Sequence, residues 1–269
     1  MTYMQFNVLN QNFKKSIMLW LISLTFMVFL IIIIGGLTRL TDSGLSMVDW
    51  QPILGTIPPL NKNQWLSVFN DYKLSPEFLY VNKNMTLEAF KYIFWWEWFH
   101  RFFARLIALV FIIPFIYFLI KKNLNSFFYK RFSIIFSLGL LQALVGWWMV
   151  KSGLSENPYV SPYRLTFHLS NAVIIYALLL WTSIEYYHLK STNFISIKSK
   201  SVFILISIFL VFITILSGGF MAGSHAGQSF NTYPLMNGKL IPDDIYIKDL
   251  GLLNLFENTV TINFNHRWI

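Results

Sequence analysis

Long runs of hydrophobic residues, separated by shorter polar segments, dominate this sequence. Each run is close to the roughly 20 residues that a helix needs to cross the hydrocarbon core of a bilayer. A helix is the expected form because it satisfies its backbone polar groups within the segment. The pattern predicts an all-α integral membrane protein with five membrane-spanning helices, at residues 17–37, 94–120, 132–150, 165–187 and 202–222.

The charges of the connecting segments predict the orientation in the membrane. One set of short segments has basic but no acidic residues: Lys14, Lys15, Lys121, Lys122, Lys130, Arg131, Lys190, Lys198 and Lys200. Basic loops remain on the cytoplasmic side, so we expect a cytoplasmic N-terminus. The longer segments 41–92, 151–164 and 223–258 have mixed charge, aromatic residues, Pro and Gly. We expect them to form folded loops outside.

Composition narrows the possible functions. Only 12% of the residues are charged, against about a quarter in soluble domains. The net charge of +9 follows from the basic loops, so nucleic acid is not an expected partner. Without cysteine, disulfides and thiolate sites are excluded, and the five histidines are the only strong nitrogen ligands. The first run is too long for a signal peptide, and a bacterial cell inner membrane is the expected location.

A short internal repeat divides the chain. The first and fifth hydrophobic runs each end in a glycine pair, followed after the same spacing by another glycine: Gly35, Gly36 and Gly44, then Gly218, Gly219 and Gly227. Each is followed later by an aromatic residue and a His-Arg pair, at His100 and at His266. The order predicts a duplicated four-helix unit. Residues 1–190 would form the complete first half, and residues 191–269 the start of an incomplete, pseudosymmetric second half.

Two histidines are expected at similar depth in the membrane. His100 and His168 lie near the outer ends of the second and fourth predicted helices, which can face each other across a bundle core. Two inward imidazoles suit bis-histidine haem ligation. The alternative is that each is a hydrogen-bonded packing residue, but ionisable groups inside a membrane are costly and usually functional. We expect His225 to be a loop residue and His188 a solvated cap.

Charged residues accompany this pair. Glu97 lies three residues before His100, on the same helix face, and Arg101 is its expected partner. Two interpretations stay open: an interfacial ion pair, or a group beside a haem that handles protons or electrons. Arginines suit carboxylates, so those near the outer helix ends could hold haem propionates or anchor to lipid phosphates: Arg39, Arg101, Arg105 and Arg164.

Several motifs together resemble one family. They are Gly35 to Ser46, Gly55 to Pro59, Glu97-Trp98-Phe99-His100-Arg101, Arg164 to Leu169, Phe230 to Met236, and Asn263 to Arg267. In this order they resemble the haem A synthases, specifically the proteobacterial and mitochondrial branch that lacks loop cysteines. The resemblance covers the whole chain.

The resemblance implies an eight-helix protein that oxidises the C8 methyl of haem O to a formyl, with oxygen from water, to make haem A for cytochrome oxidase. His100 and His168 would bind haem O as iron ligands, and Glu97 would be the catalytic carboxylate beside the methyl. The second half would hold a permanent haem b through His266. Implied partners are haem O synthase as supplier, an electron-transfer partner and the lipid membrane, and a homo-oligomer is left open.

The end of the chain departs from the family pattern. The sequence stops at Ile269, at the start of a sixth predicted helix, so we expect an incomplete haem b site and, in consequence, an inactive fragment as one outcome. Two other functions stay open: a b-type cytochrome electron carrier, which would share the histidines without requiring Glu97, and a non-haem transporter, since transporters also show repeats. The matched histidines argue against the transporter.

Overall fold

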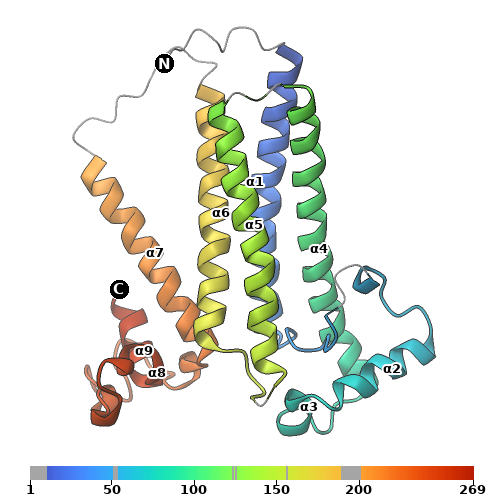
Figure 1. The fold of residues 1–269 in the computed structure, drawn as a ribbon. Coiled ribbons are helices and arrows are strands. Elements are labelled where there is room, and N and C mark those ends of the chain that lie inside the picture. Colours follow the sequence, from blue (N-terminus) through green and yellow to red (C-terminus); the bar gives the residue numbers. More distant parts are fainter. Residues whose placement is uncertain (1–10, 51–53, 123, 125, 156, 189–200) are drawn as a thin grey trace. The chain divides into compact units, whose positions relative to one another are not determined.

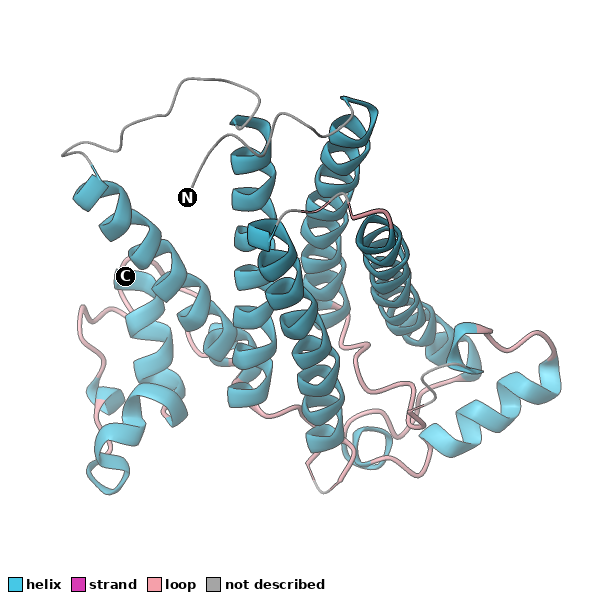
Figure 2. Ribbon diagram, turned by 45° about the horizontal axis from the view of Figure 1, so that its top comes forward, coloured by secondary structure: helices cyan, strands magenta, loops and turns pink. Residues whose placement is uncertain are grey.

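The computed structural model describes residues 11–50, 54–122, 124, 126–155, 157–188 and 201–269. Its regular secondary structure in this part of the chain is helical (Figures 1 and 2), which confirms the all-α prediction. The α-helices are α1 (Gln11–Leu40), α2 (Lys62–Tyr72), α3 (Pro76–Tyr80), α4 (Leu87–Ile120), α5 (Ser126–Gly153), α6 (Pro162–His188), α7 (Ser201–Gly223), α8 (Asn254–Glu257) and α9 (Thr259–Trp268). Short 3-10 helices join them at Leu54–Thr56, Ala226–Gln228, Asp243–Ile245 and Lys248–Leu253.

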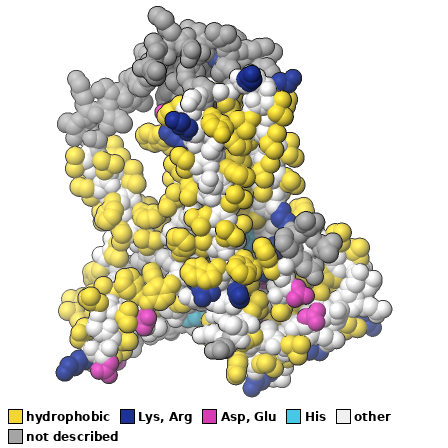
Figure 3. All heavy atoms as spheres, in the orientation of Figure 1, with side chains coloured by type: hydrophobic (Ala, Val, Ile, Leu, Met, Phe, Trp, Pro, Cys, Tyr) yellow, Lys and Arg dark blue, Asp and Glu magenta, His cyan; other side chains and the backbone are white. Residues whose placement is uncertain are grey.

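Five of the described helices are long and apolar enough to cross a membrane, and they are the five predicted ones: α1, α4, α5, α6 and α7. Hydrophobic side chains cover their surfaces (Figure 3). Some of these side chains are largely exposed, such as Phe203 at 76%, which would be unfavourable in water. A helix with apolar residues on its exposed face matches a lipid surrounding. The chain is therefore a multi-pass membrane protein.

The start of α4 differs from the prediction. The helix begins at Leu87, a turn or more before the predicted start at Phe94. Thr86 caps it, because its side-chain oxygen accepts a hydrogen bond from the backbone N–H of Ala89 at 3.3 Å. Hydropathy missed this turn because caps depend on single polar residues.

Some predictions fall on residues outside the described part of the chain. These are the positive charges at Lys190, Lys198 and Lys200, the side chain of His188, and the boundary between the two predicted halves at residues 190 and 191.

The chain divides into two compact units. The first takes in Met1–Tyr72, Met85–Leu144 and Asn171–Ile195, and the second takes in Lys73–Asn84, Val145–Ser170 and Ser196–Ile269. Both α5 and α6 therefore contribute one part to each unit. Each unit is described by itself below.

The core of the first unit forms where α1, α4, α5 and α6 lie side by side (Figure 1). Trp20 of α1 is at its centre, with ring centroids 5.6 Å from Phe111 and 5.1 Å from Phe132. Its indole Nε1 donates to the carbonyl of Val110 at 2.7 Å. That carbonyl lacks its usual helical donor, because the residue four positions on is Pro114, which has no N–H. Trp20 thus joins α1 to the point where proline interrupts the hydrogen bonds of α4.

The second unit has α7 packed closely on the first turn of α6. A Cβ added at Gly219 would lie 2.8 Å from Thr166 Oγ1, and one added at Gly223 would lie 2.7 Å from the Cα of Pro162. Gly219 and Gly223 are four residues apart on α7, the spacing that lets membrane helices approach at backbone distance. The buried Asn258 then starts α9, accepting from the N–H of Val260 at 2.9 Å.

Candidate functional site

The carboxylate of Glu97 lies at the centre of a buried polar cluster in the first unit. Glu97 is only 2% exposed. Its Oε2 accepts from Ser46 Oγ at 2.6 Å and from the Met47 backbone N–H at 2.9 Å, while Oε1 accepts from Arg101 Nη2 at 2.5 Å. The expected pair between Glu97 and Arg101 is confirmed. A buried carboxylate is tolerable only when it is paired in this way.

Local structure brings these groups together. Glu97 and Arg101 are four residues apart on α4 and therefore lie on one face. On the other side, α1 ends in a Schellman-type turn, with the Ser43 N–H donating to the Thr38 carbonyl at 3.0 Å and Asp42 in the left-handed region at φ 46°. The turn directs the following residues across α4, where Arg101 Nη2 also donates to the Met47 carbonyl at 3.2 Å.

His100 lies one turn from Glu97 on α4, and its imidazole rests against α1. A Cβ added at Gly35 would lie 3.4 Å from His100 Nε2, at the close limit of ordinary van der Waals contact. Glycine at this position therefore leaves space for the imidazole.

His168 has a similar setting in the second unit. It comes from α6 and rests against α5, where a Cβ added at Gly146 would lie only 2.9 Å from His168 Cε1. Because His100 belongs to the first unit and His168 to the second, their pairing as opposed iron ligands stays a prediction.

His266 of α9 has the third such setting. A Cβ added at Gly218 of α7 would lie 3.3 Å from His266 Cε1. Its Nδ1 is buried and has no hydrogen-bond partner among the described residues. A buried nitrogen without a partner is costly, so this imidazole suits a ligand that would occupy the nitrogen or reorient the ring.

The internal repeat is visible in these contacts. Gly35 contacts His100 as Gly218 contacts His266. Arg267 Nη2 donates to the Phe230 carbonyl at 2.9 Å, as Arg101 Nη2 donates to the Met47 carbonyl. The two acceptors correspond in the repeat, because Phe230 follows the second glycine pair at the same spacing as Met47 follows the first. His225 has φ 54° where Asp42 has φ 46°.

One difference between the two copies changes a buried charge. Three residues before the histidine, Glu97 is replaced by Asn263. Asn263 is fully buried, at 0% exposure, and its Nδ2 donates to the Ala226 carbonyl at 2.7 Å. The first copy therefore holds a carboxylate where the second holds a neutral amide.

The predicted arginines have diverse surroundings. Arg39 forms an ion pair with Asp42 at 2.6 Å. Arg164 donates to the Trp148 carbonyl at 2.8 Å and lies over the Trp148 ring, 4.4 Å from its centroid. Arg105 is half-buried one turn beyond Arg101 on α4. Binding of propionates by any of the four stays a prediction. His225 is a loop residue, as predicted, and its ring packs on Tyr159 at 4.8 Å.

Sequence reasoning missed three residues of this arrangement: Ser46, Gly146 and Asn263. The repeat contained a signal for two of them. Asn263 precedes His266 by the same three residues as Glu97 precedes His100, and Ser46 lies in the segment that the repeat singles out. Gly146 gave no signal, because only packing shows which glycine faces an imidazole.

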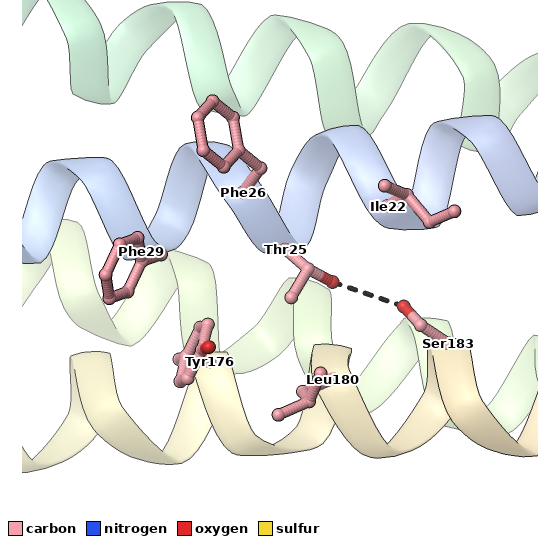
Figure 4. Close-up of a pocket in the computed structure, with 7 residues that line it drawn as sticks. All are labelled: Ile22, Thr25, Phe26, Phe29, Tyr176, Leu180 and Ser183. Carbon is pink, nitrogen blue, oxygen red and sulfur yellow. Dashed lines mark hydrogen bonds between the residues drawn. The ribbon is translucent and has the colours of Figure 1, made fainter.

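The first unit also has a groove between α1 and α6 (Figure 4), and its lining includes none of the residues of the Glu97 cluster. It encloses about 280 Å³ between apolar and aromatic side chains. Its polar residues Thr25 and Ser183 lie 3.2 Å apart, oxygen to oxygen, and each also donates to a carbonyl of its own helix. The residues lining the groove include no histidine, carboxylate or arginine, so it offers no group for ligation or acid–base chemistry.

These features define a class: a multi-pass, all-α membrane protein with a repeated loop-and-helix frame. Within the described residues it has three histidines that rest against glycines and a buried carboxylate–arginine pair. The chain belongs to the family of cytochrome oxidase assembly proteins, COX15-CtaA, whose family model matches residues 18–269.

Curated relatives support this membership. The chain is 46% identical over 260 residues to "Heme A synthase" of Nitrosospira multiformis, covering 95% of this chain and 72% of the relative. It is 45% identical to "Heme A synthase" of Nitrosomonas eutropha, over 94% of this chain and 72% of the relative. The corresponding protein of Wolbachia pipientis is 43% identical, over 94% and 76%. No solved structure matches the chain significantly.

Proposed function

We propose that this chain is a haem A synthase, an oxidoreductase that converts the C8 methyl group of haem O to a formyl group. The observation that carries the proposal is the buried Glu97 carboxylate. Glu97 forms an ion pair with Arg101 and lies one helical turn from His100. A fixed carboxylate next to a histidine is suited to accept protons released at a bound substrate. Relatives with the same name support the choice of reaction.

The reaction balances with water as the source of oxygen. The methyl group and one water molecule give the formyl group, four protons and four electrons. In this proposal His100 and His168 hold the iron of the substrate haem O, and Glu97 takes up protons beside the methyl group. The electrons pass to a redox partner in or at the membrane.

A resident haem b fits the residues of the second unit. Imidazole is a common axial ligand of haem iron. His266, backed by Gly218 and with its Nδ1 buried and unpartnered in the described part of the chain, is the residue that would hold the haem. When bound, haem b would supply one-electron transfer.

The proposal includes a cellular setting. The basic residues Lys14 and Lys130, near the starts of α1 and α5, support a cytoplasmic N-terminus. The membrane in this proposal is the bacterial inner membrane. Haem O would come from haem O synthase, and haem A would go to cytochrome oxidase.

Co-expression tests the proposal. The chain is expressed in a bacterium that makes haem O synthase but no haem A, and extracted membrane haems are separated by chromatography. We expect haem A with the chain, none with an empty vector, and none with His100→Ala. The control His225→Asn should retain haem A, because Asn tolerates the left-handed backbone of that loop position. A wild-type protein that binds haem but makes no haem A would overturn the proposed activity of this chain.

A further inference from the structure

Ser46 and its counterpart Ser229 have the same side chain in different surroundings: Ser46 is buried, whereas Ser229 is exposed. We propose that Ser46 is a positioning residue for Glu97: its hydroxyl, with the adjacent Met47 N–H, fixes carboxylate oxygen Oε2 in one place. The inference rests on the proposed function for its catalytic consequence, but the contact itself is independent of that function.

The hydrogen bonds of Ser46 indicate where its proton goes. Ser46 is 2% exposed. Its Oγ lies 2.6 Å from Glu97 Oε2, against 3.3 Å from the Ser43 carbonyl and 3.5 Å from the Ile93 carbonyl. A hydroxyl has one proton to donate, and bonds from a hydroxyl to a carboxylate are short and strong. The proton of Ser46 therefore serves Glu97.

The two carboxylate oxygens of Glu97 have different hydrogen-bond donors. Oε1 is bound by the Arg101 guanidinium, whereas Oε2 receives both the Ser46 hydroxyl and the Met47 N–H. Two donors from adjacent residues fix the rotation of the carboxyl group, which Arg101 alone would leave less defined. Ser46 thus acts on the orientation of the carboxylate rather than on its charge balance.

The second copy of the repeat shows whether the loop needs a buried serine to stay attached to its helix. There the arginine-to-carbonyl contact is kept, between Arg267 and Phe230. However, Ser229, the counterpart of Ser46, is exposed, and the counterpart of Glu97 is the amide Asn263, which donates to the Ala226 carbonyl instead. The arginine contact therefore holds the loop of the second copy without a buried serine. We infer that the Ser46 contact in the first copy serves the carboxylate.

Infrared spectroscopy of the purified chain tests the contact directly. The carboxylate band of Glu97 is the one lost in Glu97→Gln. We expect Ser46→Ala to shift this band, Ser46→Thr to restore it, and the matched control Ser229→Ala to leave it in place. An unshifted band in Ser46→Ala overturns the proposal, whether or not the protein forms haem A.

Turnover tests the consequence. Rates of haem A formation are measured in membranes at low and saturating haem O, per folded protein. Ser46→Ala should lower kcat roughly 10- to 100-fold, as loss of an orienting partner typically does, with KM nearly unchanged and with rescue by Ser46→Thr. A shifted band with unchanged kcat, or a loss confined to protein yield, overturns the positioning role. If the wild type itself forms no haem A, the proposed function fails, and the infrared result alone decides on the contact.

Discussion

Glycines determine where the candidate imidazoles can lie. His100, His168 and His266 each rest against a glycine of a neighbouring helix, at Gly35, Gly146 and Gly218. An imidazole that ligates iron must keep both its position and its ring orientation. Gly146 in particular leaves the space that the His168 imidazole takes.

Gly146→Ala should displace His168, because the new Cβ would lie 2.9 Å from Cε1 and the ring would have to turn away. We expect haem retention, measured by Soret absorbance of the purified protein, to fall by roughly tenfold or more. Gly139→Ala is the control on the same helix, since a Cβ there meets nothing within 4 Å. It should keep haem and gain up to about 1 kcal/mol in stability. Equal haem retention in both variants would contradict the proposed ligand role of His168.

Trp20 and Pro114 should be energetically coupled. Trp20→Phe leaves the partly buried Val110 carbonyl without the donor that Trp20 supplies, at a cost of about 1–3 kcal/mol. In a Pro114→Ala background the restored backbone N–H takes over, so the same substitution should cost clearly less. Thermal unfolding in detergent measures the cycle, and additive effects would show that the proline does not create the acceptor.

The sequence predicted one polar contact of the site and missed the others for a physical reason. Glu97 and Arg101 pair through helical spacing, which is readable from the chain. Ser46 reaches Glu97 only because α1 ends in a left-handed turn at Asp42. Such contacts depend on how two distant segments fold together.

At the scale of elements, close packing of α7 on α6 depends on Gly219 and Gly223. Gly223→Leu should separate the helices, because its Cβ would lie 2.7 Å from the Cα of Pro162. The Cα is a backbone atom and, unlike the end of a side chain, it cannot rotate away. We expect a loss of about 1–3 kcal/mol, measured by thermal unfolding in detergent. Ala222→Leu, at the exposed neighbouring position, is the matched control. If Gly223→Leu unfolded at the same temperature as Ala222→Leu, this would contradict the close approach of α7 and α6.

The helices themselves were predictable because hydropathy over some 20 residues averages out local detail. All five spans are confirmed. Their ends were not predictable to the residue, since Thr86 extends α4 by a single capping hydrogen bond.

At the scale of the whole molecule, the repeat supplies two similar frames with different chemistry. Each has a glycine pair, a loop with a left-handed residue, and an arginine that holds the loop carbonyl. The first adds a carboxylate at Glu97, and the second an amide at Asn263. Duplication followed by divergence, including at this buried position, would give one half for the proposed chemistry and one for the proposed electron transfer.

We propose that Glu97 is required for oxidation of haem O. The most direct test is the amount of haem A in membranes that contain Glu97→Gln, compared with Glu257→Gln at an exposed position bound by Tyr163. Both variants are first matched for protein level. We expect Glu97→Gln to accumulate haem O with haem A lowered at least about 100-fold, as for loss of a general acid–base group, while Glu257→Gln behaves as wild type. Wild-type amounts of haem A from Glu97→Gln would contradict the account.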